Sequence, residues 1–205
     1  KNNNLVISNI LNNIIKEINQ KKNTFHLLSR KYDFNFKFKS FKKFRKFKKI
    51  IIIGMGGSIL GTKAIYSFLG HKVNKDFIFF DNLSEELIKK LNKKIKKNNS
   101  LYIVISKSGN TLETLVNINL IKKAKLNKLN TIMITEKKNN TLNNLCRKMK
   151  LTVIEHKNYI GGRYSVLSET GMIPAYIMGL KIEDFRKNIL DYFKKKKKKS
   201  LIENA

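Results

Sequence analysis

The chain has 205 residues, 41% of them hydrophobic, which is enough to bury a core and excludes a disordered polypeptide. A net charge of +30 is typical of nucleic-acid-binding proteins, but the basic residues are spread over nearly every region, so we interpret the charge as a compositional bias and predict no specific nucleic-acid partner. No run approaches the ~20 apolar residues that cross a bilayer, and the single cysteine, Cys146, is consistent with a reducing environment, so we expect a cytoplasmic protein without a membrane partner.

The first 49 residues are predicted to contain a helix and a basic connecting segment. Apolar residues at helical spacing predict an amphipathic helix over residues 5–18, followed by a polar connection with a short helix near 25–30. Residues 34–49 alternate phenylalanine with lysine and arginine, a pattern that can imitate an aromatic nucleic-acid platform. The phenylalanines recur every three residues, which favours packing of one face with the lysines in solvent; they are Phe38, Phe41, Phe44 and Phe47.

Strands then alternate with helices. Strands are predicted at residues 50–53, 77–80, 101–105, 131–135 and 152–154, and helices at 58–69, 84–97, 111–126 and 141–149. This alternation forms right-handed βαβ units, and near-continuous apolar strands are buried on both faces, so we predict an α/β fold with a parallel sheet between two helical layers. A loop at 158–163, a helix at 166–179 and another helix from 182 to a lysine run complete the prediction.

Two of these strands run into turns of glycine and hydroxyl residues that open onto helices. The turns are Gly54-Met55-Gly56-Gly57-Ser58 and Ser106-Lys107-Ser108-Gly109-Asn110-Thr111. The first N–H groups of a helix have no intrahelical partner and its dipole favours negative charge, so each turn is a candidate site for an anion such as phosphate. Ser108 or Asn110 could simply cap the second helix, but four hydroxyl or amide side chains in six residues favour anion binding.

A third polar segment, Gly161-Gly162-Arg163-Tyr164-Ser165, follows the fifth strand. The glycines allow the backbone to approach a ligand closely, and the Arg163 guanidinium could stabilise an oxyanion. The alternative is an arginine that ties the loop to a sheet edge or a helix C-terminus, and the spacing leaves both interpretations open. All three segments follow the carboxyl ends of parallel strands, where such sheets bind ligands at the point of strand-order reversal.

Known nucleotide-binding loops match the first turn only in part. A dinucleotide-binding turn needs a third glycine where Ile59 stands, although Asp81 ends the second strand where a ribose-binding acid would lie, so this alternative is weakened and stays open. A P-loop needs Gly-Lys-Ser/Thr, and Gly61-Thr62-Lys63 has the wrong order. The histidines lack metal-ligand spacing, and a structural role is favoured for His156. We predict neither a cofactor nor a metal.

Together the three motifs resemble the glucose-6-phosphate isomerase family, over about residues 50–190, in the first of its two sugar isomerase (SIS) domains. This resemblance implies a five-stranded parallel sheet in a three-layer α/β/α sandwich of the SIS type. It also implies the roles of the site residues: the hydroxyls of Ser106, Ser108 and Thr111 and the amide of Lys107 bind a phosphate, Gly57, Ser58 and Gly162 line the sugar, and Arg163 stabilises an enediol intermediate.

The family's reaction interconverts glucose 6-phosphate and fructose 6-phosphate by moving a proton between adjacent carbons, which requires a positioned base. In the family this base is a glutamate of a Glu-Ser-x-Gly-Lys type segment further along the chain, and no such segment occurs here. The chain lacks an initiator Met and ends at Ala205 as a new apolar pattern begins. We therefore interpret it as a fragment, the phosphosugar-binding half of an isomerase that is inactive alone and homodimeric at full length.

The predicted domains are an N-terminal helix with a basic connecting segment at 1–49, a sugar-phosphate-binding SIS domain at 50–190, and a lysine-rich linker toward a second domain at 191–205. Glu169-Thr170 departs from the family, where small residues are expected, which slightly weakens the packing argument for that helix but not the assignment of Arg163. The alternative function is a stand-alone regulatory SIS domain that binds a sugar phosphate without catalysis, although no helix-turn-helix precedes the sheet.

Overall fold

The computed structural model describes residues 2–86, 89, 99–121 and 126–193. Most of the helix predicted at 84–97, the end of the helix predicted at 111–126 and nearly all of the predicted linker at 191–205 lie outside the described residues. The chain divides into two compact units, one of residues 1–33 with 181–205 and one of residues 34–180. The predicted domain boundaries stay a prediction.

The smaller unit consists of α1 (Asn2–Asn19) and three 3-10 helices, η1 (Thr24–Leu28), η5 (Ile182–Phe185) and η6 (Ile189–Phe193). The single helix predicted from residue 182 is wrong, because the chain leaves η5 at Arg186. The Arg186 side chain is buried, its Nε donates to Leu27 O at 3.0 Å, and its guanidinium lies 5.0 Å from the centre of the Tyr32 ring. Contacts distant in sequence therefore override the local helical pattern.

The larger unit is built on a five-stranded sheet. Its strands are β1 (Lys49–Gly54), β2 (Asp76–Phe80), β3 (Ser100–Ile105), β4 (Thr131–Thr135) and β5 (Thr152–Glu155). They pair in parallel in the order β2-β1-β3-β4-β5. The predicted strands and the α/β fold class are confirmed, and the side chains of residues 50–53 are fully buried, as expected for a strand covered on both faces.

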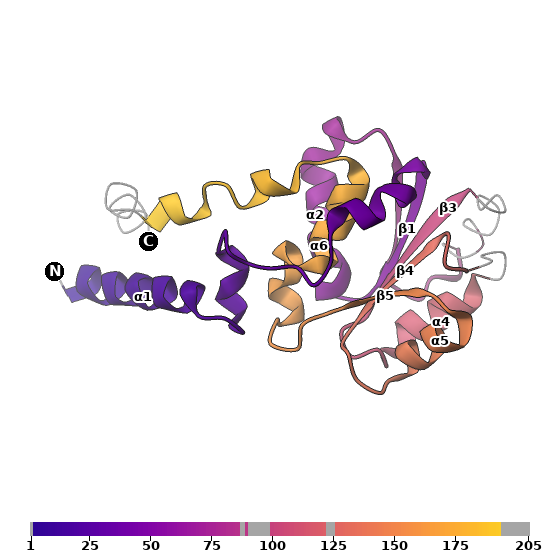
Figure 1. Cartoon of the computed structure of the whole chain (residues 1–205), viewed down its shortest axis with the longest axis horizontal. Coiled ribbons are helices and arrows are strands. Elements are labelled where there is room, and N and C mark those ends of the chain that lie inside the picture. The colour runs from indigo at the N-terminus through magenta and orange to yellow at the C-terminus, as the bar shows by residue number, and fades with distance from the viewer. Residues whose placement is uncertain (1, 87–88, 90–98, 122–125, 194–205) are drawn as a thin grey trace. The chain divides into compact units, whose positions relative to one another are not determined.

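Two layers of helices cover the sheet (Figure 1). The helices α4 (Leu112–Leu120) and α5 (Thr141–Met149) lie on one face, where Ile118 and Cys146 pack with Ile51 and Ile53. The helices α2 (Gly57–Leu69) and α6 (Glu169–Met178) lie on the opposite face, toward which the alternate residues of β1 point. None of the helices formed by the described residues is long and apolar enough to cross a membrane.

The phenylalanine-rich segment forms the 3-10 helix η2 (Phe38–Lys46), not an irregular connection. A 3-10 helix has three residues per turn, so phenylalanines spaced by three lie on one face. Phe41 and Phe44 of this helix and Phe47 after it are buried, and Phe38 packs against Tyr176 of α6 with ring centres 5.4 Å apart. The predicted packing is confirmed, and these buried rings cannot serve as a stacking platform for bases.

The segment before α6 differs from the prediction of one helix over 166–179. Residues Gly162–Leu167 form the 3-10 helix η4, and α6 begins only after its N-cap, Ser168, whose hydroxyl accepts from Thr170 N. Serine is a preferred N-cap because its oxygen satisfies an N–H group of the first turn. The arginine motif therefore lies on a separate short element between β5 and α6.

Candidate functional site

Three polar segments follow the carboxyl ends of strands in the larger unit. We call residues 54–58 the glycine turn, residues 106–111 the hydroxyl loop, and residues 156–168 the arginine loop. The glycine turn follows β1 and the hydroxyl loop follows β3, and these strands are neighbours, with Gly54 paired to Ile105. The chain passes from β1 to β2 on one side and from β3 to β4 on the other, so the strand order reverses between β1 and β3. Ligands of open parallel sheets bind at such a position.

The side chains of the hydroxyl loop converge on Thr111. Its Oγ1 lies 3.0 Å from Ser106 Oγ and 3.3 Å from Ser108 Oγ. Ser108 is exposed and Thr111 is partly exposed, whereas Ser106 is buried and accepts a hydrogen bond from Gly109 N at 3.1 Å. Ser108 and Thr111 can therefore reach a ligand directly, and Ser106 also shapes the loop from within.

The hydroxyl loop is not a simple cap of α4. The N-cap of α4 is Thr111, and its side chain makes no capping hydrogen bond. Asn110 instead accepts from Thr141 N, the first residue of α5, at 2.9 Å. Gly109 has a φ of 70°, and a Cβ there would lie 2.2 Å from Asn140 Cγ, so only glycine fits. The first turn of α4 thus faces the converged hydroxyls without a side-chain cap, as an anion site requires.

The glycine turn and the arginine loop touch through their backbones. A Cβ on Gly57 would lie 2.3 Å from the carbonyl group of Gly162 and 2.7 Å from Arg163 N. Ser165 Oγ donates to Gly162 O at 2.7 Å and lies 3.3 Å from Gly57 O. Ser58 occupies the first turn of α2 beside this contact. The absence of a side chain at Gly57 is therefore what allows the two segments to meet.

Arg163 is exposed, and its side chain makes no hydrogen bond or ion pair within the described part of the chain. The alternative interpretation, an arginine that ties the loop to a sheet edge or to a helix C-terminus, is not what the structure shows. The contact of Gly162 with Gly57 places the backbone of Arg163, while the Arg163 guanidinium is available to an anionic group.

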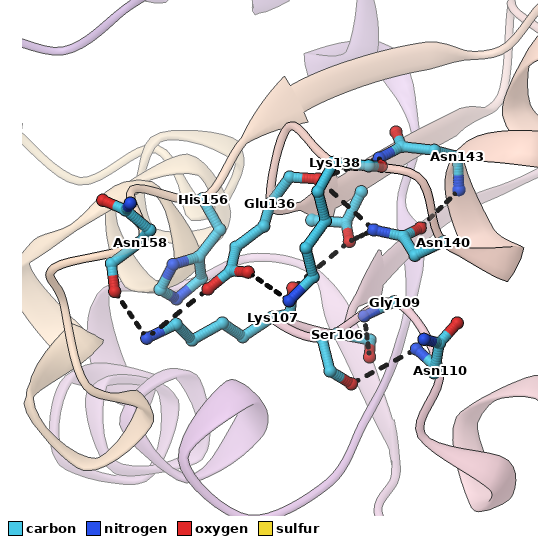
Figure 2. A network of polar contacts seen from close by, with 12 residues as sticks. Ser106, Lys107, Gly109, Asn110, Glu136, Lys138, Asn140, Asn143, His156 and Asn158 are labelled. Atoms are coloured by element: carbon cyan, nitrogen blue, oxygen red, sulfur yellow. Dashed lines mark hydrogen bonds and ion pairs between the residues drawn. The ribbon is translucent and has the colours of Figure 1, made fainter.

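The Lys107 side chain has a role that sequence reasoning missed, since only its amide was assigned. Its Nζ donates to Asn158 O at 2.8 Å and lies 3.6 Å from Glu136 Oε1 (Figure 2). It also donates to Ile160 O at 2.8 Å. Glu136 also pairs with Lys138 Nζ at 2.6 Å. Burial raises the pKa of Glu136, but the hydrogen bond and charge of Lys138 and the charge of Lys107 outweigh it and lower the pKa below its usual value. No sequence signal indicates this contact, because its partners lie far along the chain.

His156 and Glu169 form a buried pair at the base of the arginine loop. Both are 1% exposed, and His156 Nδ1 lies 3.0 Å from Lys157 O and 3.9 Å from Glu169 Oε1. Glu169 Oε1 accepts from Lys157 N at 3.1 Å. Burial lowers the pKa of His156, although the charge of Glu169 opposes the shift. The structure agrees with the structural role that the sequence favoured for His156.

Glu169 and Thr170, which stand where the family has small residues, are accommodated at the start of α6. Both are buried, and Thr170 Oγ1 donates to Ser165 O at 2.7 Å. Thr62 Oγ1 of α2 lies 3.1 Å from Thr170 O. These polar side chains therefore join α6 to the arginine loop and to α2.

The competing sites suggested by the glycine turn find no support. Ile59 is buried, and Asp81 Oδ2 pairs with Lys63 Nζ at 2.5 Å, so the acid at the end of β2 already has a cationic partner. In the described ranges no group of three or more histidine, cysteine, aspartate or glutamate residues could hold a metal ion.

The comparison with known proteins decides the family. A family model described as phosphoglucose isomerase matches residues 1–191. The chain belongs to this family. A glucose-6-phosphate isomerase from Methanocaldococcus jannaschii is 39% identical over 135 residues, which make up 65% of this chain and 33% of that protein. The chain thus spans only 33% of the length of this curated relative.

Solved structures agree with this family membership. A crystal structure of a glucose-6-phosphate isomerase from Chlamydia trachomatis matches 73% of this chain and 29% of its own, with a TM-score of 0.59 and 27% identity. A hypothetical protein from Thermus thermophilus shares the fold over 97% of this chain and 51% of its own, with a TM-score of 0.76 and 18% identity. The resemblance and the SIS-type fold predicted for this phosphoglucose isomerase family member are confirmed.

Proposed function

We propose that the larger unit is the phosphosugar-binding half of an isomerase that interconverts glucose 6-phosphate and fructose 6-phosphate. The observation that carries the proposal is the convergence of Ser106, Ser108 and Thr111 at the uncapped start of α4. Hydroxyl donors and the positive end of a helix dipole together favour a dianionic phosphate. The Lys107 amide completes this phosphate site.

The sugar then extends from the hydroxyl loop toward the glycine turn and the arginine loop. Gly57, Ser58 and Gly162 line it, since Gly57 touches the backbone of Gly162 and Ser58 follows Gly57. The glycine turn follows β1, the strand next to β3. In the reaction a base removes the proton from C2 of the aldose, an enediol forms, and the proton returns at C1. The Arg163 guanidinium stabilises the oxygen on which negative charge develops, and its freedom from other partners in the described residues is consistent with this role.

We assign no catalytic base to this chain. Glu136 is paired with two lysines, Glu169 is 1% exposed, and Glu155 accepts a hydrogen bond from Asn35 Nδ2 at 3.0 Å. A general base must reach the substrate proton directly or through one water. We propose that the base lies in a part of the protein outside these 205 residues. Homodimerisation and a cytoplasmic location, which the sequence predicted, remain part of this proposal.

Two substitutions in the hydroxyl loop test the phosphate site. Ser108→Ala and Thr111→Val each remove one hydroxyl, and Thr111→Val keeps the branched shape of the side chain. We expect each to weaken fructose 6-phosphate binding about 10-fold or more, because a hydrogen bond to a charged group contributes ~1.5–3 kcal/mol. Isothermal titration calorimetry on the 205-residue chain measures this.

Matched controls separate ligand binding from general effects. Ser40→Ala and Thr141→Val remove exposed hydroxyls of the same kinds that lie outside the hydroxyl loop, and they should leave the affinity unchanged. Circular dichroism checks that each variant keeps its fold. Equal affinity in both loop variants and the wild type would show that the converged hydroxyls only stabilise the turn, and the proposed phosphate site would be wrong.

A further inference from the structure

The Lys107 side chain links the hydroxyl loop to the arginine loop. Lys107 lies between the serines of the hydroxyl loop, yet its Nζ reaches the carbonyl of Asn158 (Figure 2). It also reaches the carbonyl of Ile160, just before Gly161. Both Nζ–O distances are 2.8 Å, which is ordinary for a strong hydrogen bond from an ammonium group. The two loops follow β3 and β5, which are separated in the sheet by β4.

The ammonium group is already committed to these contacts. An ammonium has three donors, and here two of them meet carbonyls while Glu136 Oε1 lies 3.6 Å away. Glu136 balances the charge of Lys107 and is itself shared with Lys138. The Lys107 ammonium is thus neutralised and held on the arginine loop, so it is poorly placed to act as a direct phosphate ligand.

The contact lies close to the proposed catalytic arginine. Ile160 is fully buried and is followed directly by the glycine pair and Arg163. On its other side the arginine loop rests on Gly57, where a Cβ would lie 2.3 Å from Gly162. The segment is therefore held from two sides, by the glycine turn and by Lys107.

We propose that Lys107 is a positioning residue that couples the phosphate-binding loop to the loop carrying Arg163. This rests on the proposed function, in which the phosphate and the developing oxyanion lie at opposite ends of one substrate. A fixed distance between the two anion-binding groups is what orients such a substrate, and a small displacement is costly in a positioned site. Lys107 sets that distance through the Asn158 and Ile160 carbonyls.

Two probes of different length test the coupling. Inorganic phosphate occupies only the hydroxyl loop, whereas 6-phosphogluconate adds a carboxylate at the end where the oxyanion would form. We expect Lys107→Met to weaken 6-phosphogluconate about 10-fold and inorganic phosphate less than about 3-fold, measured by calorimetry on the 205-residue chain. Arg163→Ala should produce the same pattern. The double variant, Lys107→Met with Arg163→Ala, should bind 6-phosphogluconate no more weakly than Arg163→Ala alone. The effects of two substitutions are not additive when one residue acts through the other.

Lys138→Met is the matched control, because it removes the same charge and another Glu136 contact without touching the arginine loop. It should leave both affinities unchanged. Hydrogen exchange gives a readout without ligand: Lys107→Met should speed exchange of the amides of residues 158–164 and leave the sheet amides unchanged.

The outcomes separate the two proposals. Equal losses for both probes, additive losses in the double variant, or unchanged exchange in residues 158–164 would each overturn the coupling by Lys107. If the unmodified chain fails to bind phosphate at all, the proposed function is overturned and the substrate coupling with it. Both proposals would be supported if Lys107→Met weakens the binding of 6-phosphogluconate selectively and has no further effect on that binding when Arg163 is already alanine.

Discussion

His156 is a histidine held in an environment that disfavours its charged form. It is 1% exposed, and its Nε2 has no hydrogen-bond partner among the described residues. Burial lowers its pKa in the folded state, whereas the unfolded chain should titrate near the ordinary value of ~6.5. As the pH falls below that value, the unfolded state binds a proton that the folded state does not, so the free energy of unfolding decreases.

We therefore expect the chain to be less stable at pH 5.5 than at pH 7.5, with part of the loss due to His156. His156→Gln should reduce this pH dependence, while His71→Gln, at an exposed position, should retain that of the wild type. Urea unfolding at the two pH values measures both. An unchanged pH dependence in His156→Gln would show that the buried histidine is not protonated differently in the folded and unfolded states.

At the scale of elements, the start of α2 is defined by a backbone contact with η4. Gly57 begins α2, and a Cβ there would collide with the carbonyl group of Gly162, which belongs to η4. Because both partners are backbone, neither can move aside by changing a rotamer. The glycine turn therefore contributes to the fold as well as to the proposed sugar site.

Gly57→Ala should lower the free energy of unfolding by about 1–3 kcal/mol, the usual cost of overpacking a tight contact. Gly70→Ala is the matched control, since Gly70 has α-helical dihedral angles and nothing lies within 4 Å of a Cβ there. That change should be neutral or slightly stabilising. Urea denaturation of the two variants provides the comparison, and equal stability would mean that η4 shifts without cost.

At the scale of the whole molecule, the proposed function gives this chain the phosphate site of an isomerase and places the catalytic base elsewhere in the protein. We predict that the purified 205-residue chain gives no isomerase turnover above background, while it still binds 6-phosphosugars. A coupled assay that converts glucose 6-phosphate to an optical signal tests this, with an intact isomerase as the positive control. Turnover near ~1–1000 per second, the common range of enzymes, would show that a base lies within this chain.

The sequence by itself determined the local features. Apolar runs specified all five strands to within one residue at every boundary. For β1, β3 and β4 the reason is that burial on both faces demands continuous apolar residues. The hydroxyl loop was equally visible, since Ser106, Ser108 and Thr111 lie within six residues and their convergence depends mainly on one turn. The period of three in the phenylalanines likewise matches the 3-10 helix that they form.

Only the tertiary structure decided how the segments act together. Lys107 meets Asn158 and Ile160 across more than fifty residues. Asn110 accepts a hydrogen bond from Thr141 N at the start of α5, and Glu169 is buried beside His156. No local pattern encodes these contacts, because they depend on the strand order β2-β1-β3-β4-β5 and on where each loop leaves the sheet. Helical and strand periodicity depend on residues that are neighbours along the chain. A site formed by several loops depends instead on which strands lie next to one another in the sheet.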